Sequence, residues 1–600
     1  MNKKHKSKKE KRLIYPMIPV IGLTIFMIIS PLLAFSVKIP ITGETTFYLP
    51  GRVWEDYCLA SREILTFSTG AAFLLFFLGE RVYPDKPLKA PLLHSKYIRL
   101  PLIFLGVYVL WSIISSVISK YSYVSMIGFP AEPEGLWSVF GCALLFIAAF
   151  NYMSYLETEK AQKFISFMIF GATAIIVFMS VIEWFVPMTT LFFDYEPPDK
   201  RLALLFGNSI NCGVVCAILF SAGTVLCFFE ERRLMLAAKI ALTVLIFLCV
   251  LRSRSSAALY SSLIAAAAGS LTVFIRCKGK ILNFLITTAA VAVCAGVYQL
   301  AQTGGVTDIL NNTGAYDPSN SFMLTDIKAE GNRLFLTNGS GTLELILNDG
   351  NLSFEKDGKE TSFVQTEDGW AAALDEEYSM VSVILSDELL SLDLGYSYPI
   401  YFEITGDVFQ YIGLNGYIEE MSDKPPFPEF SDYYRLGTGR VYIWLNTVSM
   451  LKDCLFKGYG AGEYVFHYPH ADIVGSLNTH GVVPLITPKP HCMYLQIFTS
   501  YGFPALVAFI CFAALILKRG ITAPIPNGEE SIIALCAGMI CFLISGVAND
   551  PNSTFGIWFW VMAGAAEALY EKNISRCNRN DNNNTYFLHN LHSNIVVHNK

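Results

Sequence analysis

The sequence has few charged residues for its length. Only 16% of the 600 residues are charged, whereas soluble globular chains carry roughly a quarter. Hydrophobic residues make up 53%, and the mean hydropathy is +0.44. A single soluble core is therefore excluded, and the composition predicts an integral membrane protein.

Several catalytic and structural signatures are also missing. The sequence contains no nucleotide-binding glycine loop and no nucleophilic triad. Most of the fourteen cysteines lie in apolar stretches, so neither a disulfide framework nor a paired zinc motif is expected. The histidines His467, His470 and His480 match no closed zinc pattern. We therefore expect no metal and no cofactor.

Apolar stretches make up much of the sequence. Many are long enough to cross the roughly 30 Å hydrocarbon core of a membrane as a helix. They predict an all-α polytopic membrane protein with about twelve transmembrane helices. The expected spans are residues 13–37, 62–79, 98–118, 135–152, 164–185, 209–229, 236–251, 255–275, 281–300, 502–517, 531–547 and 554–570. Nine of them precede a long loop and three follow it, within residues 13–302 and 501–570.

The distribution of Lys and Arg predicts the orientation, because these residues resist translocation. The strongly basic segment 1–12 is expected to stay in the cytoplasm, and the apolar stretch after it is an anchor without a cleavage site. Alternation then places every basic short loop inside, together with the polar tail 571–600. Residues 303–500 fall outside the cytoplasm, and so do Arg252 and Arg254.

The long outer loop has two parts. Short alternating apolar runs over residues 320–425, with Asn338-Gly339 and Asp349-Gly350 turns, predict a small inserted β domain. Its simplest interpretation is an accessory folded insert without chemistry of its own. The loop is acidic, which would repel a phosphate backbone, so no nucleic-acid partner is expected.

The second part of the loop contains an amphipathic helix, expected at 438–457. Val441, Trp444, Val448, Leu451 and Leu455 recur at helical spacing, so this face is expected to lie on the membrane or the bundle. Thr438 is the expected N-cap and Gly458 the expected stop, which puts Arg440 in the first turn. A cation there opposes the helix dipole unless an anion such as phosphate binds at the same end.

Five segments in order carry a family resemblance: RLALLFGNSIN at 201–211, LRSRSSAAL at 251–259, GRVYIW with KGYGAGEY, PHCMYLQIFTSYGFPAL at 490–506, and GVANDPNSTFGIWFW at 546–560. With these, the chain resembles the O-antigen ligase and polysaccharide polymerase superfamily of bacterial membrane glycosyltransferases. The resemblance covers most of the bundle but not the β insert. Members commonly have His-Asn where this chain has His491-Cys492.

The resemblance implies a multi-pass protein of the bacterial plasma membrane. Its donor would be a polyprenyl diphosphate-linked glycan, and its acceptor a glycan, lipid or protein hydroxyl. Outside the cytoplasm no nucleotide sugar is available, so the donor must carry its own activated bond. The enzyme must then stabilise a departing diphosphate, for which preorganised cations are the strongest means.

The candidate catalytic residues are Arg254, Arg440 and His491, which we expect to meet in one cavity. His491 would act as a base or, if protonated, bind phosphate. Two of them have a simpler explanation: an interfacial anchor for Arg254, and a loop histidine bonded to backbone for His491.

Four further residues are candidates for substrate binding. Arg252 would be an interfacial anchor if it does not bind substrate, and Arg201 follows an acidic stretch that offers a surface salt bridge. Asn208 and Asn211 would hydrogen-bond sugar or phosphate, or else cap a helix.

The alternatives to a ligase are a repeat-unit polymerase on the same scaffold, and a transporter or flippase of the same lipid-linked glycan. A transporter should show internal repeats and charged residues near mid-membrane, which the sequence lacks. A sensor with a membrane anchor would not need twelve spans.

Overall fold

The computed structural model describes residues 17–597 with short gaps. The gaps are 50–51, 83–90, 194–200, 278–280, 303–304, 312–323, 362, 367–368, 373–377, 379–380, 387, 395–398, 422–426, 482–484 and 525–530, and side chains are described up to 577. The basic segment 1–12, the first residues of the β insert (320–323) and the side chains of most of the tail 571–600 lie outside the described residues.

Within the described residues, nine helices are long and apolar enough to cross a membrane. They are α3 (Leu59–Val82), α5 (Arg99–Ile118), α7 (Leu136–Tyr155), α8 (Thr158–Ile182), α10 (Ser209–Cys227), α11 (Arg233–Arg252), α12 (Ser256–Arg276), α13 (Ile281–Ala301) and α19 (Phe503–Thr522). Two shorter apolar helices, α2 (Met17–Ile29) and α20 (Ser531–Ser545), pack beside them. The chain is thus a multi-pass membrane protein, and each expected span coincides with a helix.

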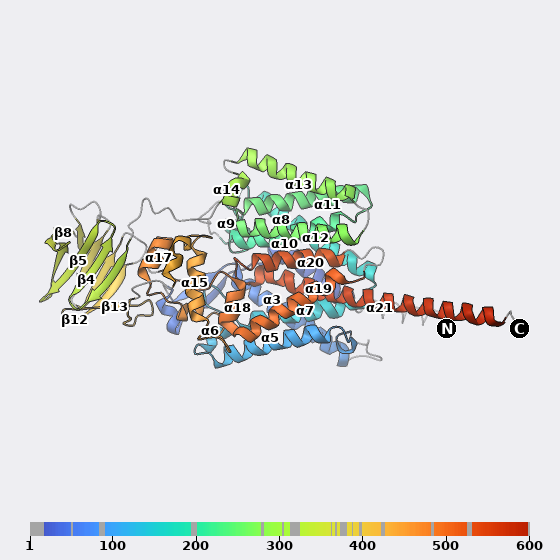
Figure 1. Ribbon diagram of the computed structural model, residues 1–600, viewed down its shortest axis with the longest axis horizontal. Coiled ribbons are helices and arrows are strands. Elements are labelled where there is room, and N and C mark those ends of the chain that lie inside the picture. Colours follow the sequence, from blue (N-terminus) through green and yellow to red (C-terminus); the bar gives the residue numbers. More distant parts are fainter. Residues whose placement is uncertain are drawn as a thin grey trace.

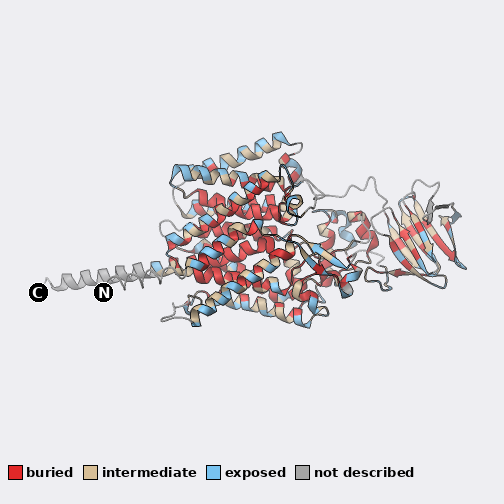
Figure 2. Ribbon diagram, turned by 180° about the vertical axis from the view of Figure 1, so that it is seen from behind, coloured by how far each residue is buried: buried red, intermediate tan, exposed pale blue. Residues whose placement is uncertain are grey.

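The last expected span, 554–570, is the first part of α21 (Ser553–Val597), which continues as a helix into the polar tail. Figure 1 shows this extension and the β domain at opposite ends of the bundle. The core of the bundle centres on α10, which is buried almost along its whole length, whereas α13 lies at the edge (Figure 2).

The β insert forms two antiparallel sheets with consecutive strand order. One contains β3 (Asp326–Glu330), β4 (Arg333–Asn338), β5 (Gly341–Asn348), β6 (Asn351–Lys356) and β7 (Lys359–Glu360). The other contains β8 (Phe363–Thr366), β9 (Gly369–Ala372), β10 (Ser382–Ser386), β11 (Leu389–Asp393), β12 (Ile400–Thr405) and β13 (Val408–Ile412). The expected turns join β4 to β5 and β5 to β6, where Asp349 and Gly350 both have positive φ.

The β domain is not isolated from the rest of the loop. Its hydrophobic core includes Ile473, Val474 and Leu477 of α17 (Ile473–His480), and Asn478 donates a hydrogen bond to the Leu324 carbonyl at 2.6 Å. The insert is therefore packed onto the loop segment that leads to His480.

The remaining elements are short. The sequence did not predict the hairpin of β1 (Val37–Pro40) and β2 (Val53–Asp56). The other helices are α4 (Pro91–His94), α6 (Ser122–Ile127), α9 (Met188–Phe193), α14 (Gly305–Asn311), α15 (Arg440–Met450), α16 (Tyr464–His467) and α18 (Met493–Tyr501), with 3-10 turns at Ser30–Leu32, Gly43–Phe47 and Pro428–Tyr433.

Candidate functional site

Helix α15 is shorter than the expected segment 438–457. It begins at Arg440 after Gly439, whose φ is +81°, and ends at Met450, so Thr438 is not the N-cap and Gly458 is not the stop. Thr438 itself has φ +64°, which does not suit an N-cap residue. A Cβ on Gly439 would collide with the His480 ring, so the glycine lets α17 approach the start of α15.

The backbone amides at the start of α15 have hydrogen-bond partners within the protein. The amides of Arg440, Val441 and Tyr442 already donate, at 3.4 Å, to carbonyls of the preceding turn. Any anion bound here would therefore be held by the Arg440 guanidinium and not by free backbone N–H groups.

The structure distinguishes between the two expected neighbours of the apolar stripe, the membrane and the bundle. Val448 and Leu455 are each more than 40% exposed, whereas the opposite face is buried and polar. On that face Tyr442 donates to Asp472 at 2.8 Å, and the Thr447 and Tyr464 hydroxyls share a hydrogen bond of 2.6 Å. The apolar stripe does not pack on the bundle at these positions, which leaves the membrane as its expected neighbour.

His491 pairs with a carboxylate that the sequence did not single out. Its Nδ1 lies 2.9 Å from Oδ2 of Asp550, in the loop between α20 and α21. The Asp550 side chain is only 5% exposed. An Nδ1–H donated to Asp550 fixes the ring's tautomer and leaves Nε2 as the basic nitrogen.

Asp550 also connects His491 to Arg440. Burial would raise the pKa of the Asp550 carboxyl, but Lys489, His491 and Arg440 together hold it below its ordinary value. For Arg440, burial lowers the pKa of the guanidinium and the charge of Asp550 opposes that shift. Of the three expected catalytic residues, His491 thus contacts this buried carboxylate directly, and the charge of Arg440 acts on it.

Lys489 is the centre of a buried ionic cluster. Its Nζ lies 2.6 Å from Glu132, 3.6 Å from Glu134 and 3.7 Å from Asp550. Burial would lower the pKa of Lys489, but the three carboxylates raise it above its ordinary value. Burial raises the pKa of Glu134 well above the usual range. The sequence did not predict this cluster. Lys489 directly precedes the family-like segment 490–506, which contains His491, and Asp550 lies within the segment 546–560.

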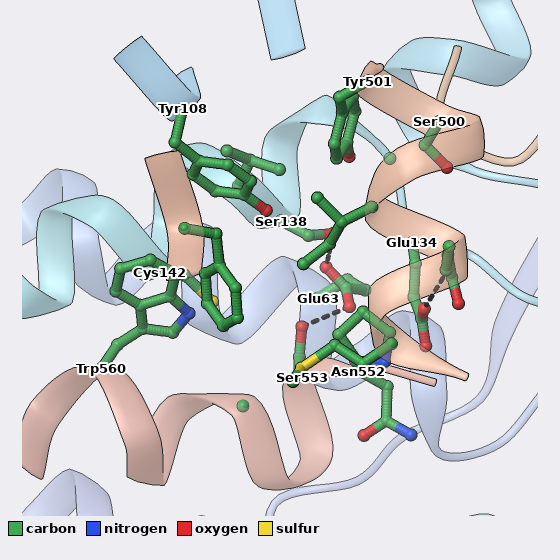
Figure 3. Close-up of a pocket in the computed structure, with 18 of the residues that line it drawn as sticks. Glu63, Tyr108, Glu134, Ser138, Cys142, Ser500, Tyr501, Asn552, Ser553 and Trp560 are labelled. Carbon is green, nitrogen blue, oxygen red and sulfur yellow. Dashed lines mark hydrogen bonds between the residues drawn. The ribbon is translucent and has the colours of Figure 1, made fainter. Parts of the chain in front are cut away.

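A small, mainly apolar cavity of about 70 Å³ with a few polar side chains lies next to this cluster, between α3, α7, α18 and α21. Figure 3 shows Glu63 at its centre, where it accepts hydrogen bonds from Ser138 and Ser553. Glu134 lies at its edge and accepts a bond of 3.2 Å from Gln496. This space holds a few waters at most, so a glycan would have to bind outside it.

The two asparagines have structural partners. Asn208 is the N-cap of α10 and its side chain accepts from the Asn211 amide at 2.8 Å. Asn211 donates to the Phe206 carbonyl and accepts from Asn552, two residues after Asp550. They therefore brace the loop that carries Asp550 against α10.

The other three candidate arginines differ in their surroundings. Arg252 donates to the Ser180 carbonyl at 2.8 Å, and its guanidinium lies 4.7 Å from the centre of the Trp184 ring. Arg254 and Arg201 are exposed. Across the described part of the chain, no hydrogen bond or ion pair joins Arg254 to Arg440 or His491, so the predicted meeting of all three stays a prediction.

Comparison with known proteins gives no family. No protein-family model matches the chain, and no curated protein matches it. The function must therefore be argued from the geometry of the site and from the motifs themselves.

The loop histidines are buried separately. His467 stacks on Tyr459 with ring centres 3.9 Å apart, and His470 accepts from the Thr487 amide at 3.3 Å. Burial lowers the pKa of His467 to about 4, of His480 to about 4 and of His470 to about 3. Among the described residues, no three His, Cys, Asp or Glu side chains are grouped as metal ligands.

These shifts predict an acid-dependent loss of stability. Between pH 6.5 and about 3 the unfolded chain binds a proton at position 470 that the folded chain does not, so stability falls as pH falls. We expect His470→Gln to become more stable relative to wild type by about 1–2 kcal/mol between pH 7 and pH 5. Thermal unfolding in detergent at both pH values measures this. An unchanged difference in stability between the variant and wild type at the two pH values would contradict it.

Proposed function

We propose that this protein is an extracytoplasmic membrane glycosyltransferase of the O-antigen ligase or polymerase type. It would transfer a glycan from a polyprenyl diphosphate carrier to an acceptor hydroxyl. The observation that carries the proposal is the hydrogen bond between His491 and buried Asp550, a carboxyl whose pKa the charge of Arg440 helps to lower. Helices α15 and α18, which begin at Arg440 and two residues after His491, lie at the end of the bundle that faces the β domain (Figure 1). Two motifs of the resemblance, distant in sequence, thereby contribute to one charged group.

In the proposed reaction His491 is the base. Its Nε2 takes the proton of the acceptor hydroxyl as the oxygen attacks the anomeric carbon, and the bond from that carbon to the diphosphate breaks. The electron pair leaves with the diphosphate, and the configuration inverts. Asp550 holds the ring in the reactive tautomer and stabilises the imidazolium that forms, as the carboxylate of a hydrolase triad does.

Arg440 is proposed to bind the departing diphosphate. A guanidinium makes bidentate contacts to phosphate oxygens, and a half-buried one gains strength because water screens it less. The proposal requires no metal and no cofactor, because protein cations supply the positive charge. Arg254, with Arg201 and Arg252 behind it, is proposed to extend this cationic path for the donor.

The proposed topology has twelve spans with both termini in the cytoplasm. The nine long helices, α2, α20 and the start of α21 supply the spans, and the basic loops supply the orientation. The proposed location is the bacterial plasma membrane. A membrane-impermeant thiol label on intact cells should then react with Asn351→Cys in the β domain but not with Arg576→Cys, both measured against wild type. The reverse pattern would contradict the topology and the site together.

The experiment that tests the function uses purified protein in nanodiscs with a defined polyprenyl diphosphate-linked glycan and a candidate acceptor glycan. We expect free polyprenyl diphosphate to appear in step with glycosylated acceptor. Growth of the donor's own glycan would identify a polymerase instead of a ligase. Movement of intact donor across the bilayer without cleavage would identify a transporter and refute the proposal.

A further inference from the structure

The structure contains a second, larger cavity far from the ionic cluster along α10. It has a volume of about 680 Å³ and lies between α10, α12 and α13. Its lining comes from the C-terminal parts of α10 and α12 and from the N-terminal part of α13. Examples are Phe228 in the turn after α10 and Ile281 at the start of α13. In the proposed topology this is the cytoplasmic half of the membrane.

The cavity exists because two consecutive helices diverge. Helix α13 packs mainly on α11, and α12 packs mainly on α10 and α20. We call this cavity between α12 and α13 the wedge. Phe220 and Phe228 of the α10 segment line it, together with small side chains such as Ala266 and Ala267 of α12. Its outer rim, including Leu271 and Phe274, is more than half exposed and would face lipid.

The chemistry of the lining calls for a hydrocarbon occupant. Three of its four hydroxyl groups are already bonded within their own helices: Thr224 donates to Phe220, Ser270 to Ala266 and Thr287 to Asn283. Among the described residues, no buried side-chain nitrogen or oxygen that lines the wedge lacks a hydrogen-bond partner, so the lining offers water few bonds. Apolar cavities of only about 150 Å³ already bind hydrophobic molecules.

The mouth of the wedge carries positive charge. Asn283 of α13 donates to the Phe228 and Glu230 carbonyls, which brings the loop with exposed Arg232 and Arg233 to the α13 end of the cavity. Glu230 is paired with Lys239 at 2.8 Å and is therefore neutralised. Exposed Glu231 lies in the same loop and offsets one of the two arginines, so the loop keeps one net positive charge. An anionic headgroup would be attracted to this rim while its chain fills the wedge.

We propose that the wedge between α12 and α13 is a binding site for the acyl chain of an anionic phospholipid from the cytoplasmic leaflet. The bound chain completes the packing of α13, which otherwise has little protein around it. The site is independent of the glycosyl-transfer chemistry and would exist whatever the bundle catalyses.

The test uses purified protein in nanodiscs of equal phosphatidylglycerol and phosphatidylcholine, with a phosphatidylglycerol whose acyl chain carries a diazirine. We expect photolabelling of peptides from α12 and α13 that line the wedge, and one phosphatidylglycerol retained in native mass spectrometry. The Phe side chain of Ala267→Phe would occupy part of the wedge and exclude about two methylene groups of the acyl chain. The affinity for the retained phosphatidylglycerol should then fall about tenfold. Ile264→Phe, on the lipid-facing surface of the same helix, is the matched control and should retain the lipid.

The headgroup is tested separately. The double substitution Arg232→Gln with Arg233→Gln should remove the preference for phosphatidylglycerol over phosphatidylcholine and leave chain binding in place. Retention unchanged by Ala267→Phe, or label spread evenly over all lipid-facing helices, would overturn the proposal. So would displacement of the labelled lipid by polyprenyl diphosphate, since the wedge would then hold the donor's tail.

Discussion

Arg440→Ala is expected to lower the rate of glycan transfer about a hundredfold or more. The loss follows from removing a preorganised cation that faces the departing diphosphate, and such groups contribute several kcal/mol in shielded sites. Arg440→Lys should recover only part of the rate, because a point charge does not reproduce bidentate contact with phosphate. The initial rate of polyprenyl diphosphate release by purified protein measures both effects.

Two other arginines serve as comparisons. Arg333 of the β domain pairs with Glu344 at 2.7 Å, and Arg333→Ala should leave the rate near wild type. Arg254→Ala should fall between the two, because Arg254 is exposed and is not among the groups that shift the pKa of Asp550. If Arg440→Ala is as active as Arg333→Ala while folding normally, Arg440 does not bind the leaving group.

Lys489→Met is expected to cause the largest loss of stability. The substitution keeps much of the side-chain volume but leaves Glu132, Glu134 and Asp550 without their shared cation. Removing one partner of a buried ionic cluster costs about 3–5 kcal/mol, because the remaining charges stay desolvated. Thermal unfolding of the purified variant in detergent should show a clearly lower midpoint, and part of the loss should be relieved at acid pH as the carboxylates become protonated.

Lys163→Met is the matched control for this result. Lys163 also makes an ion pair of 2.6 Å, with Glu159, but both side chains are more than 70% exposed. Exposed pairs contribute about 0–1 kcal/mol. Equal shifts for the two lysine variants would show that the Lys489 cluster is hydrated and does not hold the loops together.

The sequence predicted the large features of the fold because hydropathy and turn chemistry act locally. Every expected span contains a helix, although the first, 13–37, ends in a 3-10 turn and at the start of β1, and the Asp349-Gly350 turn joins two strands of the β domain as expected. The order of the motifs selected Arg440 and His491, whose roles stay predictions. Such local patterns can be recognised in the sequence without knowing which distant residues come into contact.

The sequence did not reveal the partners that are brought together from distant segments. Lys489 and Asp550 lie about sixty residues apart, and nothing in their spacing indicates that they meet near Glu132. The sequence also did not reveal which side of α15 is buried, for a different reason. Its buried face is held by hydrogen bonds of Tyr442 and Thr447, and hydropathy scores such polar residues as exposed.

The most direct test of the central claim is the rate of polyprenyl diphosphate release by purified His491→Ala with saturating donor and acceptor. If His491 is the base held by Asp550, the rate should fall about a hundredfold or more while donor binding changes little. Asp550→Asn should lower the rate as well, because the amide no longer favours the reactive tautomer. His467→Ala, which changes a histidine outside the group around Asp550, should stay near wild type. A wild-type rate for a folded His491→Ala would contradict the proposed mechanism.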